Sequence, residues 1–186
     1  LNNLIPLATP EHKEQFKQDL ATCLEQFEPT FLEHYGQGLC QKMGLPHFHK
    51  DSLDCSFAFL RILQTEQLDY TQSFIRLQNK EYKTLRDDCL DLRQFDAFLH
   101  QYQEIRKTQD RDELDRVMQS ANPHYILRNH MAQKAIALAE RGDLSEVDRL
   151  FKLLHQPFQK QPDLETEQDV APLPSDVPEV MVSCSS

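Results

Sequence analysis

Apolar residues recur at intervals of three and four residues along almost the whole chain, which is the period of an α-helix. A clear example is the stretch that carries Phe95, Phe98, Leu99, Tyr102 and Ile105. Only 4 of the 186 residues are glycine, whereas glycine-rich phosphate loops and dinucleotide-binding βαβ units depend on several glycines close together. The pattern predicts an all-α protein, an irregular multi-helix bundle of seven to eight helices without a convincing strand.

Capping residues and prolines predict where several of these helices begin and end. A helix that starts near residue 11 is expected to end near Pro29, which can occupy the first position of the next helix. Three further helix starts are marked by side chains that can accept a hydrogen bond from free backbone N–H groups. They are Asp69, Asn122 followed by Pro123, and Asp143 with Glu146 three residues later.

The composition changes at Gln156. The last 31 residues contain five of the ten prolines and six acidic residues against one lysine. Such a segment buries too little apolar surface to fold by itself. We therefore expect a helical domain over residues 1–155 and an extended acidic, proline-rich tail over residues 156–186. Its apolar end, Val180-Met181-Val182, leaves open whether the tail is frayed or docked on another surface.

Charge and cysteine content limit the partners and the compartment. With 20 Lys and Arg against 30 Asp and Glu, the net charge is −10, so nucleic acid is not an expected partner. No apolar stretch approaches the roughly 18 residues of a membrane span. An odd number of five cysteines without a Cys-x-x-Cys pair suggests a reducing, cytoplasmic location. We expect Cys23 and Cys40 to be small core residues, whereas Cys184 is either an accidental or a reactive thiol.

No catalytic, cofactor-binding or metal-binding residues can be assigned from the residues alone. His47 and His49, with Asp51, Asp54 and Cys55 nearby, include the ligand types of a metal site. A histidine-rich loop of this kind is usually just solvated, and Asp51 can cap a helix instead. A metal-binding regulatory domain therefore stays a third possibility, which would require zinc to be bound stoichiometrically.

Two local strings are specific enough to indicate a family. The stretch from Asn122 to Ile136 resembles the Asn-Pro-x-aromatic-aliphatic-Leu-Arg-Asn signature of the selenoprotein O / YdiU family. Here the signature residues are Asn122, Pro123, Leu127, Arg128 and Asn129. A Gly-Asp-Leu-Ser-Glu run follows at residues 142–146, and the terminal Ser-Cys-Ser-Ser is similar to the end of family members that carry cysteine or selenocysteine. The resemblance extends over essentially the whole chain.

The resemblance implies a parent protein adenylyltransferase with a kinase-like fold, which uses ATP with magnesium or manganese and transfers AMP to hydroxyl side chains of protein substrates. None of the family's nucleotide-binding or catalytic motifs matches this sequence, which begins at Leu1 rather than at a methionine. We therefore expect a C-terminal fragment, inactive alone, whose partner is the missing N-terminal kinase-like lobe. Cys184 would be its redox-regulatory residue. The alternative is an independent helical protein-interaction module.

Overall fold

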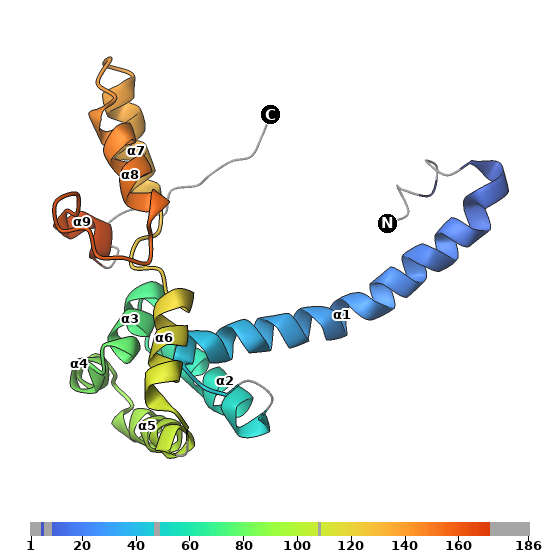
Figure 1. The fold of residues 1–186 in the computed structure, drawn as a ribbon, viewed down its shortest axis with the longest axis horizontal. Coiled ribbons are helices and arrows are strands. Elements are labelled where there is room, and N and C mark those ends of the chain that lie inside the picture. The colour runs from blue at the N-terminus through green and yellow to red at the C-terminus, as the bar shows by residue number, and fades with distance from the viewer. Residues whose placement is uncertain (1–4, 6–8, 47–48, 108, 172–186) are drawn as a thin grey trace. The chain divides into compact units, whose positions relative to one another are not determined.

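The computed structural model describes residue 5 and residues 9–46, 49–107 and 109–171, and all regular secondary structure in these residues is helical (Figure 1). The all-α prediction is therefore confirmed. The elements are η2 (Pro10–His12), α1 (Lys13–Met43), α2 (Lys50–Thr65), α3 (Tyr70–Gln78), α4 (Tyr82–Asp87), α5 (Leu92–Lys107), α6 (Arg111–Ala121), α7 (Asn129–Ala139), α8 (Ser145–His155) and α9 (Glu167–Val170). Within these ranges, no helix combines the length and apolar character that a bilayer crossing needs.

The chain divides into two compact units, residues 1–39 and residues 40–186. The first unit consists mainly of α1, and two predictions about it are wrong. Pro29 lies inside α1 instead of separating two helices. Its fixed φ is compatible with a helix, and α1 continues through it although the ring removes one hydrogen bond and crowds the preceding turn. Cys23 is exposed on this helix rather than in a core.

The core of the second unit is built from aromatic rings on α2, α3 and α5. The ring of Phe59 meets that of Phe74 edge-on at 5.3 Å between centroids and stacks on Phe98 at 4.9 Å. Phe98 in turn contacts Phe95, about one turn earlier along α5, and Tyr102, about one turn later. The helical spacing of these residues therefore predicted the buried face of α5 correctly.

Polar groups at the end of α5 secure the loop after α1. The Tyr102 hydroxyl donates a hydrogen bond to the Met43 carbonyl at 2.9 Å. Arg106 Nη1 donates to the carbonyl of Gly44 at 2.9 Å, and its other terminal nitrogen pairs with Asp115. Arg106 is only 7% exposed. Ile105, which we predicted for the buried stripe, is half-buried. The structure also buries Arg106, because loop carbonyls and a carboxylate accept its hydrogen bonds.

Helices α7 and α8 lie side by side (Figure 1) and share a smaller core with residues that follow them. Its members are Tyr125, Met131, Ala135, Leu150 and Leu153, with Leu154, Leu164 and Val170 packed against them. Residues up to 171 of the expected tail thus contact the helices. Residues 172–186 lie outside the described residues, and the division at residue 155 stays a prediction.

The predicted helix starts have different outcomes. Asp69 is the N-cap of α3, and its side chain accepts a hydrogen bond from the Gln72 N–H at 2.8 Å, as predicted. Asp143 accepts from the Ser145 N–H at 2.9 Å. The predicted capping box is wrong, however, because the N-cap of α8 is Leu144 and Glu146 pairs with Arg149 instead. The helix start predicted at Asn122 is also wrong, because this residue is the C-cap of α6 and α7 begins at Asn129.

Candidate functional site

The signature residues form an extended connector between α6 and α7, which we call the signature connector (residues 122–128). Asn122 is the C-cap of α6 with φ −108° and ψ 100°, and Arg128 is the N-cap of α7 with φ −100° and ψ 152°. The dipeptide Asn122-Pro123 therefore ends one helix rather than opening the next. The physical reason is that proline disfavours the helical conformation of the residue before it, while contacts from other elements hold the residues that follow.

Asn122 is buried and joins three elements of the second unit. Its side-chain amide donates to the Lys42 carbonyl at 2.8 Å and to the side-chain oxygen of Gln78 at 3.3 Å. In return, the Lys42 ammonium donates to the Ala121 carbonyl at 2.9 Å. Burial lowers the pKa of Lys42. The end of α1 and the end of α3 are thereby tied to the end of α6.

Arg128 forms a two-pronged ion pair with Asp69. Its Nη1 lies 2.7 Å from Asp69 Oδ2, and its Nη2 lies 3.2 Å from Oδ1. Burial alone raises the pKa of Asp69, but the hydrogen bonds from Arg128 and from the Gln72 N–H outweigh it and hold this pKa below its usual value. One atom of the guanidinium, Nε, is buried without a hydrogen-bond partner among the described residues. The pair joins the N-terminus of α3 to that of α7.

The middle of the signature connector holds the segment after α8. The backbone N–H groups of His124 and Tyr125 both donate to the Pro157 carbonyl, at 2.6 and 3.1 Å. The buried Tyr125 hydroxyl donates to Glu165 at 2.5 Å and accepts from the Gln161 N–H at 2.8 Å. Burial and the neighbouring Glu165 carboxylate raise the pKa of Tyr125 to about 12. The start of the connector thus contacts the end of α1, its middle contacts the segment after α8, and its end contacts the start of α3.

The remaining predicted residues do not converge on one point. Pro123 is half-buried, Leu127 is exposed, and Asn129 is exposed as the first residue of α7. Cys184 lies outside the described residues. In the described part of the connector, the Tyr125 hydroxyl and His124 Nε2 both lie close to the Glu165 carboxylate, at 2.5 and 3.7 Å. Apart from Arg128 Nε, the buried polar side-chain groups of the connector are engaged in hydrogen bonds that position helices.

The histidine loop before α2 gives no support to a metal site. His47 lies outside the described residues, and His49 is exposed at the N-cap of α2. Burial raises the pKa of Cys55 to about 12, which opposes the thiolate form that binds metals. In the part of the chain that the structure describes, no three His, Cys, Asp or Glu residues lie together as metal ligands do.

Comparison with known proteins decides the family. The model of the family described as "Protein adenylyltransferase SelO" matches residues 1–155. The chain belongs to the SelO family. Among its relatives, the protein nucleotidyltransferase YdiU of Pectobacterium atrosepticum is 38% identical over 174 residues, which are 90% of this chain and 35% of that protein. The YdiU proteins of Yersinia pseudotuberculosis and Shewanella sp. MR-7 are 35% and 34% identical, again over 90% of this chain and over 35% and 37% of theirs. The chain therefore spans about a third of the length of these relatives.

In this SelO chain, sequence reasoning found the signature residues but not their partners. The sequence predicted Asp69 as a helix start, yet nothing local indicated that Arg128 would reach it across 59 residues. Lys42 and Glu165 gave no signal either, because each is an ordinary charged residue within a helical or polar stretch. Only the folded arrangement reveals that the signature positions helices.

Proposed function

We propose that this chain is the C-terminal helical portion of a protein adenylyltransferase, whose complete form transfers AMP from ATP to hydroxyl side chains of proteins. The observation that carries the proposal is the match of residues 1–155 to the protein adenylyltransferase SelO family, together with relatives that are about three times as long. The nucleotidyltransferases named among those relatives support the class of reaction.

In this proposal, the nucleotide and its magnesium or manganese ion bind to the kinase-like lobe outside this chain. Two findings support this placement of the nucleotide site outside the chain. The buried polar residues of the signature connector are engaged in hydrogen bonds within the chain. The described residues also offer no cluster of metal ligands that would suit a divalent cation. We therefore assign no catalytic step to these helices, which act as a structural support.

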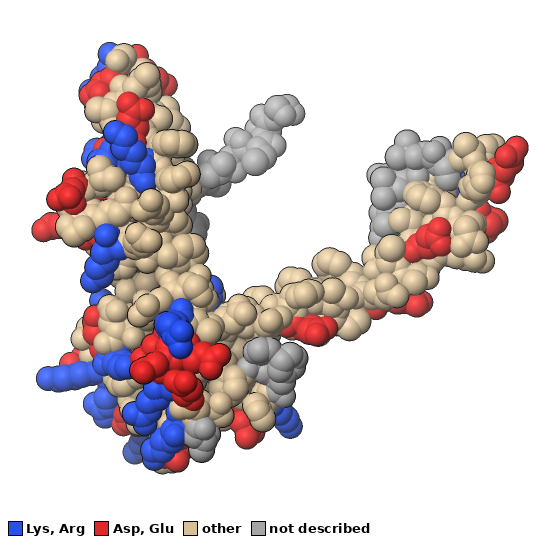
Figure 2. All heavy atoms as spheres, viewed as in Figure 1, with Lys and Arg blue, Asp and Glu red and all other residues tan. Residues whose placement is uncertain are grey.

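The surface proposed to contact the kinase-like lobe is one face of α1. Leu24, Phe27 and Phe31 follow one another at helical spacing, and each exposes more than half of its surface. Figure 2 shows long uncharged stretches along this helix. A row of exposed large apolar side chains indicates a surface that is covered in the complete protein. The missing two thirds of the parent supplies a partner of sufficient size.

The test compares the 186-residue chain with the complete parent in transfer of labelled AMP from ATP to a protein acceptor, with magnesium or manganese. We expect transfer by the complete protein and none by the chain alone. Isothermal titration should also give no submicromolar affinity of the chain for ATP. Transfer by the isolated chain, or a native product of only 21.8 kDa, would contradict the proposal.

We further propose a redox-regulatory role for Cys184. In a disulfide, Cys184 and a second thiol would lose two electrons and two protons to a cellular oxidant such as a peroxide. Burial raises the pKa values of Cys40, Cys55 and Cys89, which makes these poor partners. The partner is therefore the exposed Cys23 or a thiol of the missing lobe.

The free buried thiols of Cys40, Cys55 and Cys89 also support our proposal of a cytoplasmic location.

Mass spectrometry of the oxidised complete protein tests this role. We expect a cross-linked peptide that contains Cys184, and its second cysteine identifies the partner. A Cys184→Ser variant should lose this peptide. Finding only free thiol at Cys184 under oxidising conditions would end the redox proposal without affecting the proposed transferase.

The second candidate function is an independent helical interaction module. It is favoured by exposed apolar side chains on and beside α8, namely Leu144, Phe151 and Phe158. The size of the native product separates the two candidates, since a module would be made as a short protein and the transferase as a much longer one.

A further inference from the structure

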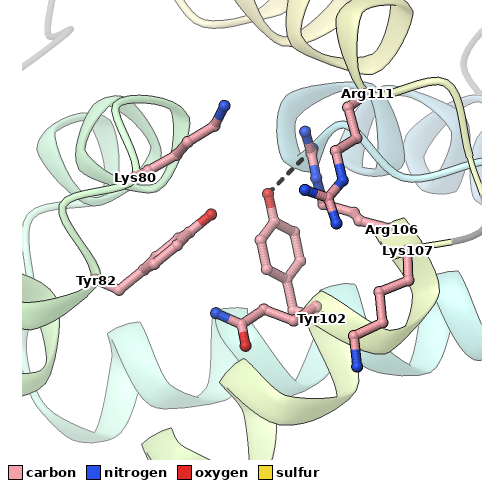
Figure 3. A pocket seen from close by; sticks show the side chains of 7 residues that line it. Lys80, Tyr82, Tyr102, Arg106, Lys107 and Arg111 are labelled. Carbon is pink, nitrogen blue, oxygen red and sulfur yellow. Dashed lines mark hydrogen bonds between the residues drawn. The ribbon is translucent and has the colours of Figure 1, made fainter.

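A cavity of about 270 Å³ lies among the segment between α3 and α4, the last turns of α5 and the start of α6 (Figure 3). Its lining residues are Lys80, Tyr82, Tyr102, Gln103, Arg106, Lys107 and Arg111. Four of the seven are cationic and none is acidic, although the whole chain carries a net charge of −10. This concentration of positive charge is therefore local, and we call the cavity the basic pocket.

Two walls face each other across the basic pocket. Figure 3 shows Lys80 and Tyr82 on one side, and Arg106, Lys107 and Arg111 on the other. Arg106 is held firmly, because it donates hydrogen bonds to the Gly44 carbonyl at 2.9 Å and to the Tyr102 hydroxyl at 3.2 Å. The pocket thus has a fixed base, whereas Lys80, Lys107 and Arg111 are exposed and can adjust to a ligand.

The carboxylates near the basic pocket leave part of its charge unbalanced. Asp115 pairs with both Arg106 and Lys80, and its carboxylate lies 2.8 Å from the Lys80 ammonium. Glu104 pairs with Lys107. Arg111 forms no ion pair with the residues that the structure describes. Arg106, Lys80 and Lys107 thus share two carboxylates and Arg111 pairs with none, so the cations of the lining outnumber their ion-pair partners.

The hydroxyl of Tyr82 shows that these charges act at one place. Burial raises its pKa, the positive charges of Arg106, Lys80 and Arg111 oppose that rise, and the Asp115 carboxylate adds to it. These cations come from both walls, so their fields meet at the Tyr82 hydroxyl. This group forms no hydrogen bond with the described part of the chain, and it is available as a donor to a bound anion.

The backbone at the start of α6 does not supply the binding groups. Asp110 is the N-cap of this helix, and its side chain accepts hydrogen bonds from the N–H groups of Asp112 and Glu113, at 3.0 and 3.2 Å. Recognition would therefore depend on side chains. A guanidinium offers paired N–H donors to oxyanions, and an ammonium can contact a further oxygen from another direction.

We propose that the basic pocket binds a small anion that carries phosphoryl groups. The total charge of this anion is about −2 or more negative. The excess of cations in the lining matches such a ligand. Donors on two facing walls suit the tetrahedral arrangement of phosphoryl oxygens better than the planar carboxylate. The cavity has room for two linked phosphoryl groups. This inference uses only contacts within residues 40–186 and does not depend on the proposed transferase function.

Titration of inorganic pyrophosphate into the 186-residue chain at low ionic strength tests the proposal. Calorimetry should give one saturable site, and amide NMR signals near Lys80, Tyr82 and Arg111 should move. Arg111→Gln should weaken binding at least tenfold, and Tyr82→Phe should weaken it by about threefold. Lys83→Gln is the matched control, since this exposed α4 residue lies outside the lining. Its affinity should stay within twofold of the original.

Several results would overturn the proposal. Absence of saturable pyrophosphate binding is one, and equal weakening by Lys83→Gln and Arg111→Gln is another, because it indicates general charge attraction. Succinate that binds as tightly as pyrophosphate would reject recognition of phosphoryl groups. Among the described residues, neither Arg111 nor the Tyr82 hydroxyl holds a helix in place, so unchanged circular dichroism and denaturation midpoints should accompany the loss of binding.

Discussion

Gly44 shows how one residue decides the geometry of the loop after α1. Its φ of +58° lies in the left-handed region, which glycine adopts without strain. A Cβ atom there would come within 2.6 Å of Met118 Cγ and would also collide with the Arg106 guanidinium. Backbone conformation and packing therefore both require glycine at the point where Arg106 and Tyr102 reach the loop carbonyls.

We predict that Gly44→Ala lowers the free energy of unfolding by about 2–4 kcal/mol, since strain at a left-handed φ adds to overpacking. Gly142→Ala is the control. Gly142 also has a positive φ, but a Cβ atom added there would meet no heavy atom within 4 Å, so only strain of about 1–2 kcal/mol is expected. Urea denaturation of the chain measures both. Equal losses would contradict the role of packing at Gly44.

At Asp69, a lowered pKa links the ion pair with Arg128 to pH. The carboxylate contributes stability that is present above its unfolded pKa, near 3.8, and that is lost as the pH falls through the lower folded value. We predict that Asp69→Asn, which keeps a capping side chain but leaves Arg128 buried without its charge partner, destabilises the chain by about 2–4 kcal/mol at pH 7. The difference from the original should shrink below pH 3.8. A pH-independent difference in denaturation midpoints would contradict this.

Among the elements, α8 and α9 are joined through one arginine. Arg149 donates to Glu146 in the preceding turn, to Asp169 at 2.7 and 3.0 Å, and to the Leu164 carbonyl at 2.7 Å. The two carboxylates raise the pKa of Arg149. Asp169 also accepts from the Thr166 N–H at 2.7 Å. A helix of four residues is unstable alone, so these contacts and the packing of Val170 against the small core hold α9 in place.

We predict that Asp169→Ala releases residues 161–171 from α8 because it removes both the partner of Arg149 and the acceptor for Thr166. Amide hydrogen exchange should become at least tenfold faster in this segment and stay unchanged in α2 and α5. Asp148→Ala, at an exposed position of α8, is the control. Uniformly faster exchange throughout the second unit would instead mean that the whole unit loses stability.

For the molecule as a whole, the first unit differs from the second in what it buries. The second unit has an aromatic core and a second small core between α7 and α8. The first unit, by contrast, exposes large apolar residues on α1, of which Phe27 is 65% exposed. Hydrophobic burial is worth about 25 cal/mol per Å², so this surface is a strong site of association in the absence of its partner.

We predict that the isolated chain self-associates at micromolar concentrations through α1, and that Phe27→Asp combined with Phe31→Asp makes it monomeric. Analytical ultracentrifugation measures the change. Gln26→Asp combined with Glu25→Gln alters exposed polar positions of the same helix and should leave association unchanged. Association that persists in the phenylalanine variant would exclude this face as the contact surface.

Sequence and tertiary structure decided different features of this protein. Helical spacing determined the all-α class and the buried face of α5, and the capping side chain of Asp69 determined the start of α3. These features depend on residues a few positions apart. The family signature could be recognised for the same local reason. Only the folded chain decided that Asn122 ends a helix, that Arg106 is buried, and that the basic pocket brings Lys80 to Arg111. These outcomes depend on partners tens of residues away, whose hydrogen bonds and charges override local preference.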